Sequence, residues 1–217
     1  MTSGRRATRR DLQAQQTRRD IVQAARRLLG GKGYARTSMA EIAREAGVAV
    51  QTVYSSVGPK KAFLRELNEL IDEEAGVGGL VATLAATDHP RERLRLAAHV
   101  GRRVVERTGD IVSAVHAGAG TDPALAEVLA EGRTRHWEGM RSLAMWLADA
   151  GALRDGLAPE HAAQVIAVLL SNEVYFQLTR DMGKTFDEAE NWVLTILETL
   201  VLAPGVLLPV QGSGPGP

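Results

Sequence analysis

The sequence MAEIAREAGVAVQTVYSSVGPK, residues 39–60, contains the pattern that decides the fold of this chain. Small or apolar residues surround Gly47, at Ile42, Ala43, Ala46, Val48 and Val53. Two helices that meet at about 90–120° across a short turn need a small residue at their contact and a glycine that can adopt positive φ. The spacing therefore predicts a DNA-binding helix-turn-helix, with an ordinary pair of antiparallel helices as the alternative.

The formal charge of the chain is zero, but the charge is unevenly divided. Residues 1–61 contain 13 Lys and Arg against 4 Asp and Glu, a balance of +9, and the remaining residues contain 13 against 22, a balance of −9. A cationic segment that coincides with a helix-turn-helix indicates binding to a polyanion. The alternative is a solvated charged surface without a partner.

The composition suggests a soluble intracellular protein. Of its 217 residues 45% are hydrophobic, which is enough for one or two packed units. The absence of cysteine excludes disulfides and thiolate metal sites and suits a reducing cytoplasm. The arginines near the N-terminus precede no apolar run, so no signal peptide is expected, and no stretch approaches the ~18 apolar residues of a membrane span. We expect a cytoplasmic protein without a membrane partner.

Sequence motifs for catalysis are missing. The five histidines are scattered, and no pair has the i, i+4 spacing of a helix-borne zinc site. The chain also lacks GxSxG, GxxxxGK, and a GxGxxG that opens a helix after a strand. We therefore predict no enzyme activity, no metal and no cofactor. The alternative to a DNA-binding protein is then a helical adaptor whose basic head binds RNA or an anionic membrane.

Hydrophobic periodicity predicts an all-α fold, because apolar residues recur at helical spacing and no strand pattern stands out. The stripe of Ile21, Ala24, Ala25 and Leu28 predicts a first helix over residues 17–29, which Gly30, Gly31 and Gly33 would end. Further helices are predicted over residues 59–74, 90–107, 111–117, 123–150, 159–182 and 186–202. We expect a flexible basic arm at 1–16, a helix-turn-helix domain at 17–63, a larger helical domain at 64–203 and a disordered tail at 204–217.

Residues 17–64 resemble the N-terminal domain of the TetR (tetracycline-repressor) family of transcriptional regulators. The residues that carry the resemblance are Ile21, Ala24, Ala25, Leu28, Gly33, Tyr34, Thr37, Ser38, Ile42, Ala43, Ala46, Gly47, Val48, Thr52, Val53, Tyr54 and Lys60. The resemblance implies a three-helix DNA-binding head, with ligand binding and dimerisation in the domain at 64–203. It also implies a homodimer on a palindromic double-stranded DNA operator, released by a small-molecule effector. Repression is the commoner behaviour of the family.

Contacts to the DNA backbone follow from the same resemblance. It implies that Thr52, Tyr54 and Lys60 contact phosphates, together with Thr37 or Ser38 near the start of the preceding helix. Their chemistry agrees, because hydroxyls, lysines and helix N-terminal amides are common phosphate donors.

Sequence readout would fall to the second helix of the motif. Gln51 can pair with adenine through two hydrogen bonds, and Val50 and Ser55 are further candidates for base contacts. Arg44 is either a DNA contact or a solvent-facing helix residue. Ala49 stands where a capping serine is common in the family, so this helix is expected to begin less firmly.

The C-terminal helices carry apolar stripes that, by the resemblance, form a four-helix interface between two subunits. We expect this dimer interface to include Val165, Val168, Leu169, Tyr175, Phe176, Val193, Ile196, Leu197, Leu200 and Val201. The alternative is that these residues form an internal core.

The family resemblance also implies an effector pocket in the body of the protein. Candidate lining residues are His116, His136, Trp137, Met140, Trp146, Asn172 and Phe176. For each of them the alternative is an ordinary core or surface position. The chemistry of the effector is not specified by these residues.

Overall fold

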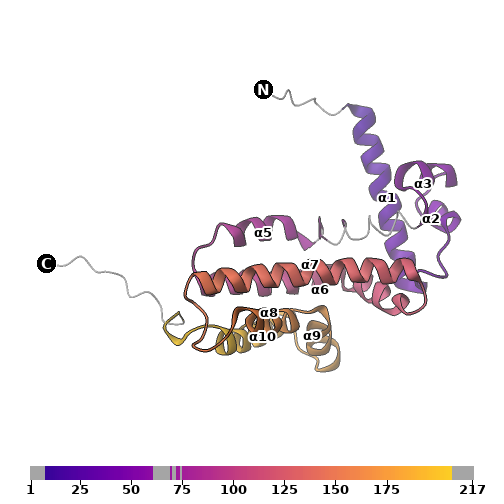
Figure 1. Ribbon diagram of the computed structural model, residues 1–217. Helices are drawn as coiled ribbons and strands as arrows, with labels where there is room; N and C mark the ends of the chain where they lie inside the picture. Colours follow the sequence, from indigo (N-terminus) through magenta and orange to yellow (C-terminus); the bar gives the residue numbers. More distant parts are fainter. Residues whose placement is uncertain (1–7, 61–68, 70–71, 74, 207–217) are drawn as a thin grey trace. The chain divides into compact units, whose positions relative to one another are not determined.

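The computed structural model describes residues 8–60, 69, 72–73 and 75–206 (Figure 1). Within these ranges the chain is helical and has no strand, apart from an isolated bridge between Leu153 and Leu202. The all-α prediction is therefore confirmed. The helix predicted over residues 59–74 has its apolar stripe outside the described residues, at Phe63, Leu64, Leu67 and Ile71.

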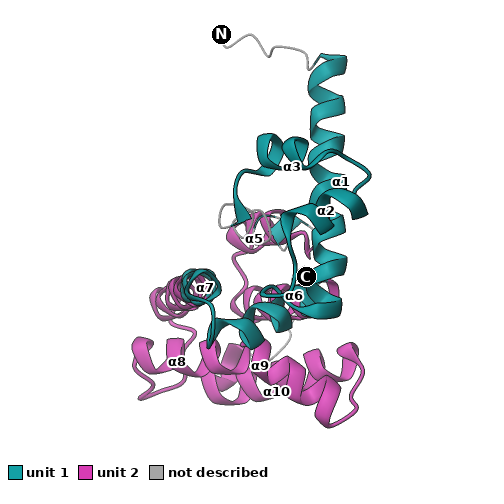
Figure 2. Cartoon of the chain, turned by 90° about the vertical axis from the view of Figure 1, so that its right-hand side faces the viewer, with its two compact units in different colours: residues 1–73, 108–132 teal, residues 74–107, 133–217 magenta. Residues whose placement is uncertain are grey.

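The backbone divides into two compact units, which Figure 2 colours separately. Unit 1 is Met1–Glu73 with Thr108–Gly132, and unit 2 is Glu74–Arg107 with Arg133–Pro217. The sequence placed residues 108–132 in the larger second domain. They group with the helix-turn-helix instead, because their apolar side chains pack in its core.

Unit 1 contains α1 (Arg9–Lys32), α2 (Met39–Glu45) and α3 (Val50–Val57), with the end of α6 (Pro90–Ala119) and the start of α7 (Pro123–Asp149). Its core joins residues of the three N-terminal helices to four residues of the later segment. The core members are Ile21, Val22, Ala25, Leu29, Tyr34, Met39, Ile42, Ala43, Val53, Val57, Ile111, Val115, Leu125 and Val128.

Helix α1 begins at Arg9 rather than at residue 17, so the flexible arm predicted for residues 1–16 is wrong from Arg9 onward. The reason is a capping box. The Thr8 hydroxyl accepts a hydrogen bond from the Asp11 backbone, and the Asp11 carboxylate accepts one from the Thr8 backbone. At its other end α1 continues through Gly30 and Gly31 and stops at Lys32, where Gly33 has a φ of 79°.

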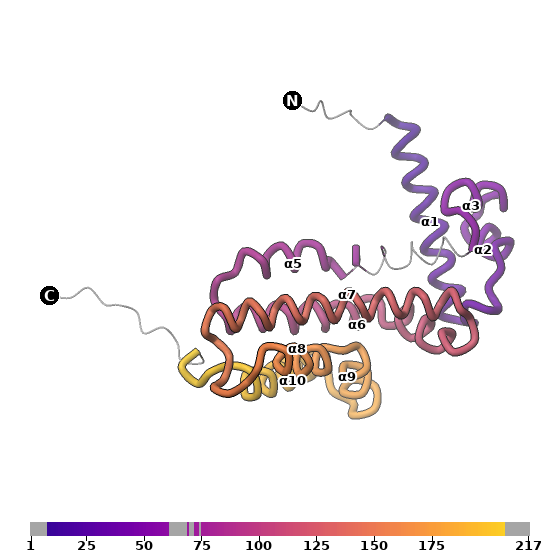
Figure 3. The backbone as a smooth tube through the Cα atoms, viewed as in Figure 1, coloured from indigo at the N-terminus to yellow at the C-terminus, as the bar shows by residue number. Residues whose placement is uncertain are grey.

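Unit 2 contains α5 (Val77–Ala85), α8 (Pro159–Leu169), α9 (Asn172–Phe176), a π-helix (Gln177–Asp181), α10 (Phe186–Val201) and a 3₁₀ turn (Pro204–Val206), which can be followed along the backbone in Figure 3. The rest of α6 and α7 belongs to the same unit. Its largest fully buried side chains are Leu94, Leu147, Ile166, Tyr175 and Leu197.

Two predicted helix limits differ from the structure. The helices expected at 90–107 and 111–117 form one element, α6, which contains a non-helical residue at Thr108 (φ −133°, ψ 15°). The helix expected at 159–182 breaks after Leu169, because the Ser171 hydroxyl caps α9 at Val174 N (3.4 Å). Apolar periodicity does not register a capping serine inside a helical stretch.

Candidate DNA-binding surface

The turn between α2 and α3 has the geometry that its glycine predicts. Gly47 has a φ of 69°, a left-handed conformation that a side chain would disfavour. The Val48 backbone N–H donates to the Ala43 carbonyl (3.0 Å), and that of Ala46 donates to the Ile42 carbonyl (2.9 Å). These hydrogen bonds close the end of α2 and turn the chain into α3. The helix-turn-helix prediction is confirmed.

The first turn of α2 is held by a capping box. Ser38 and Glu41 exchange backbone and side-chain hydrogen bonds, and the Lys32 ammonium donates to the same carboxylate. The hydrogen bond from Lys32, followed by those from Ser38, lowers the pKa of Glu41 to about 2. Glu41 therefore stays charged and fixes the start of α2, where Ser38 is exposed.

Thr37 differs from its neighbour. Its side chain is only 2% exposed, and its hydroxyl donates to the Gly33 carbonyl (2.9 Å). The structure contradicts the prediction that the Thr37 side chain contacts phosphate, because this hydroxyl stabilises the end of α1. Of the pair Thr37 and Ser38, Ser38 alone is exposed.

Helix α3 separates its buried and exposed faces clearly. Val53 and Val57 are buried in the unit 1 core. The exposed residues are the predicted contacts Val50, Gln51, Tyr54 and Ser55, while Thr52 is half-buried. No side chain caps the helix at Ala49, as the sequence predicts. The predicted base-reading residues therefore share the outward side of one short helix.

Two further predicted contacts flank this helix. Arg44 is exposed on α2. Lys60 is half-buried, with its ammonium donating to the Tyr34 carbonyl (2.8 Å) and lying 4.1 Å from the centre of the Tyr34 ring. Burial, followed by the charge of Asp122, raises the pKa of Tyr34 to about 12, so Tyr34 is a neutral packing residue. An ammonium has three donors, so a phosphate contact by Lys60 stays a prediction.

Residues 21–67 match the family described as bacterial regulatory proteins, tetR family. The N-terminal region of this chain is a TetR-family DNA-binding domain. Among curated proteins, none matches the sequence.

Solved structures share the fold along the whole TetR-type chain. The SmeT–triclosan complex has a TM-score of 0.72 at 19% identity and covers 93% of this chain and 99% of its own. NalD, the secondary repressor of the MexAB-OprM multidrug efflux pump in Pseudomonas aeruginosa, has a TM-score of 0.69 at 19% identity, covering 87% and 98%. The transcriptional regulator FadR from Bacillus subtilis with stearoyl-CoA has a TM-score of 0.66 at 19% identity, covering 82% and 96%.

The predicted effector residues of this TetR-family chain do not gather in one place in the described residues. His116 belongs to unit 1, where its Nδ1 lies 2.8 Å from the Val112 carbonyl oxygen. The other six belong to unit 2, and His136 Nε2 lies 2.8 Å from the Ala167 carbonyl oxygen. Within unit 2 the core is flanked by Met140, Trp146 and Phe176, while Trp137 is exposed and Asn172 is half-buried.

The predicted dimer residues fall into two groups. Tyr175, Val193 and Leu197 are fully buried within unit 2. Their assignment to an intersubunit surface is wrong, because they face the core of their own chain. The remaining residues are exposed or half-buried, with Val168 at 63% and Leu200 at 48% exposed, and Val165, Leu169 and Ile196 between them in burial.

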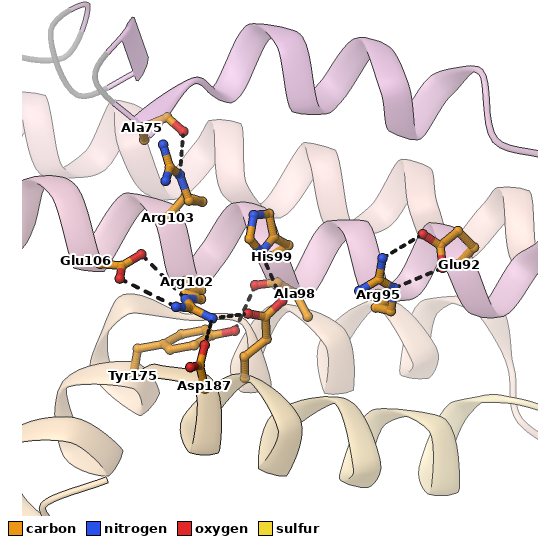
Figure 4. A network of polar contacts seen from close by, with 11 residues as sticks. Ala75, Glu92, Arg95, Ala98, His99, Arg102, Arg103, Glu106, Tyr175 and Asp187 are labelled. Carbon is orange, nitrogen blue, oxygen red and sulfur yellow. Dashed lines mark hydrogen bonds and ion pairs between the residues drawn. The ribbon is translucent and has the colours of Figure 1, made fainter. Parts of the chain in front are cut away.

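A polar network on α6 and α10 was not anticipated from the sequence (Figure 4). The Arg102 guanidinium bonds Asp187 and also donates to Glu190 (2.9 Å), whose other oxygen lies 3.1 Å from His99 Nδ1. The hydrogen bond to Glu190 is the main cause that raises the pKa of Arg102. The partners are more than eighty positions apart, so only the spacing of Arg102 and Glu106 gave a local signal.

A second arginine holds the end of α5. Arg93 is 8% exposed, donates to the carbonyls of Ala85 and Thr87 (2.8 Å each) and stacks 3.7 Å from the centre of the Trp146 ring. Among the described residues no group of His, Cys, Asp or Glu is placed to hold a metal ion. In that part of the chain, no helix is long and apolar enough to cross a membrane.

Proposed function

We propose that this TetR-family chain is a cytoplasmic transcriptional regulator that binds a palindromic operator as a homodimer, represses there without catalysis, and is released by a small molecule. The outward face of α3 carries the proposal. Gln51, Tyr54 and Ser55 are exposed there, on a segment whose charge balance is +9. A short helix with its polar face outward fits the major groove, about 12 Å wide.

Each part of this surface has a separate task in binding. Gln51 offers the donor and acceptor pair that reads adenine, and Ser55 lies one turn further along α3. The hydroxyls of Tyr54 and Ser38 and the ammonium of Lys60 are placed at its edges as phosphate donors. Phosphate contacts make binding fall steeply with salt, because bound counterions are released.

The second face of α10 supports a homodimer. One side of this helix, with Val193 and Leu197, is buried in unit 2. The other side is also apolar, and Trp192 and Leu200 are 41% and 48% exposed there. A helix that is apolar on both sides is usually buried on both. With Val168 of the adjacent helix α8, this face fits a second copy of the chain.

Support for a small-molecule effector comes from unit 2 and from the structural neighbours. SmeT is solved with triclosan and FadR with stearoyl-CoA. In this chain α5 has a largely apolar sequence, yet it has no buried residue. Its C-terminal end is held by Arg93, which also contacts Trp146. An apolar molecule that packs against α5 would change the surroundings of this pair.

The decisive experiment selects duplexes from a random-sequence library with the full-length protein and measures their affinity by fluorescence anisotropy. The proposal expects a palindromic consensus. Gln51→Ala should then lose about 1–3 kcal/mol of discrimination at one base pair of each half-site. Tyr54→Phe should weaken all duplexes to a similar extent, because a phosphate contact carries no sequence information.

Gln164→Ala is the matched control, since Gln164 is an exposed glutamine on α8 of unit 2. It should leave both the consensus and the affinity unchanged. Equal affinity of the wild-type protein for random DNA, RNA and anionic vesicles would overturn the proposal and favour a basic adaptor.

A further inference from the structure

The first part of α1 is a helix that packs against no core of its own. The buried residues of α1 begin at Ile21, and every residue from Thr8 to Gln16 is exposed. A solvent-exposed helical segment of this length is marginal in water, and here it is held by the Thr8–Asp11 capping box and by a hydrogen bond from Gln16 to Asp20 (2.9 Å).

This segment extends past the recognition helix α3 in unit 1. The Arg18 guanidinium donates to the Ser56 carbonyl near the end of α3 (2.6 Å), which fixes α1 beside α3 at that level. In both views α1 continues beyond α3 towards its N-terminus (Figures 1 and 2). Arg10 lies eight residues before Arg18, which places it about 12 Å further along the helix axis.

Helical geometry decides which side chains of this segment face the same way as the DNA-binding head. Positions 10, 14, 17 and 21 are spaced by four, three and four residues, so Arg10 and Ala14 lie on the face of Ile21. Ile21 is fully buried against the helices of the head. Leu12 and Arg19 lie on the opposite face of α1.

We propose that residues Arg9–Gln16 form a rigid helical arm that contacts the phosphate backbone of the operator about one groove width beyond the site of α3. Arg10 makes the contact from the α3 side of the arm, and the sequence adds Arg9 beside it against a single acid, Asp11, which is engaged in its capping box. The polyanionic duplex is the partner that this charge fits. The inference rests on the proposed function, since it extends the same DNA surface.

The test compares a pair of variants with identical charge change. Ala14→Glu places a negative charge on the α3 side of the arm, and Leu12→Glu places one on the other side, at a residue that is 56% exposed. Both substitutions keep good helix formers. Ala14→Glu should weaken binding to the library-selected duplex several-fold, while Leu12→Glu should leave it near the wild-type value. Circular dichroism should show the same helix content in both.

A third variant measures the contact itself. Arg10→Gln should lower the slope of log K against log salt by about 0.9, the value of one phosphate contact, with the selected consensus unchanged. Arg19→Gln, on the opposite face, should keep the wild-type slope. Equal losses for Ala14→Glu and Leu12→Glu, or an unchanged slope for Arg10→Gln, would overturn the arm. So would Arg10-dependent binding to anionic vesicles in place of the duplex.

The two proposals fail in different ways. If the wild-type protein selects a palindrome but the arm variants bind it as the wild type does, only the arm is wrong. If the wild-type protein selects no sequence at all, the proposed function is wrong.

Discussion

At the scale of single residues, Glu41 links the charge of the head to its stability. Its carboxylate accepts hydrogen bonds from Lys32 and from the Ser38 backbone (2.9 Å) and hydroxyl (2.8 Å). These bonds lower its pKa from 4.5 to about 2. A carboxyl with a depressed pKa stabilises the folded head above its unfolded pKa, and this contribution is lost as the pH falls towards the folded value.

We therefore predict that Glu41→Gln lowers the stability of the head at neutral pH and flattens its loss between pH 4.5 and about 2. Urea denaturation followed at several pH values measures both effects. Glu45→Gln is the control, because it removes the same charge from α2 but breaks only an exposed ion pair with Arg27 (2.9 Å). An equally flat profile for the control would contradict the assignment to Glu41.

At the scale of elements, the two helices of the motif begin in different ways. Helix α2 starts with the reciprocal bonds of Ser38 and Glu41, whereas α3 starts at Ala49 with no side-chain cap. The recognition helix therefore has several unsatisfied amides at the end that approaches DNA. It is held in place by Val53 and Val57 rather than by its own cap.

A pair of opposite substitutions tests this difference. Ser38→Ala should destabilise the head by about 1 kcal/mol, and Ala49→Ser should stabilise it by up to a similar amount, since serine supplies the missing cap. Thermal unfolding of the full-length protein measures both changes. Ala49→Gly, which adds no cap hydroxyl, should give less than Ala49→Ser. No gain from Ala49→Ser would mean that α3 is already capped by other groups.

Local signals in the sequence were sufficient for the helix-turn-helix but not for every helix limit. The residues around Gly47 define the turn because each one acts within a few positions of it. The start of α1 also had a local signal, since Thr8 and Asp11 have capping-box spacing, but the missing apolar stripe hid it. The Arg102 network joins residues far apart in the chain, so periodicity carries no trace of it.

At the scale of the whole molecule, apolar spacing indicates that a face is buried but not which chain buries it. Tyr175 and Val193 have the same helical spacing as Val168 and Leu200. The first two are fully buried within unit 2, and the last two are 63% and 48% exposed. The sequence could place all four in a contact, and only the fold separates core from candidate interface.

This separation predicts how dimerisation is lost. Val168→Glu or Leu200→Glu should give folded monomers, because the new carboxylate sits on an exposed face and opposes association. Sedimentation velocity and circular dichroism measure the two properties together. Met182→Glu is the control, since Met182 is 59% exposed outside this face. Dimers that persist in both interface variants would place the subunit contact elsewhere.

The core of unit 1 also bears on how a protein of this kind acquires a new operator. Because Ile111, Val115, Leu125 and Val128 complete that core, the head is not a cassette that a crossover near residue 73 could exchange intact. A recombinant head would meet foreign side chains in its interior and lose packing that costs about 2–5 kcal/mol per large residue. New DNA specificity should therefore arise by point substitution on the outer face of α3, while the inner face stays matched to segments far along the chain.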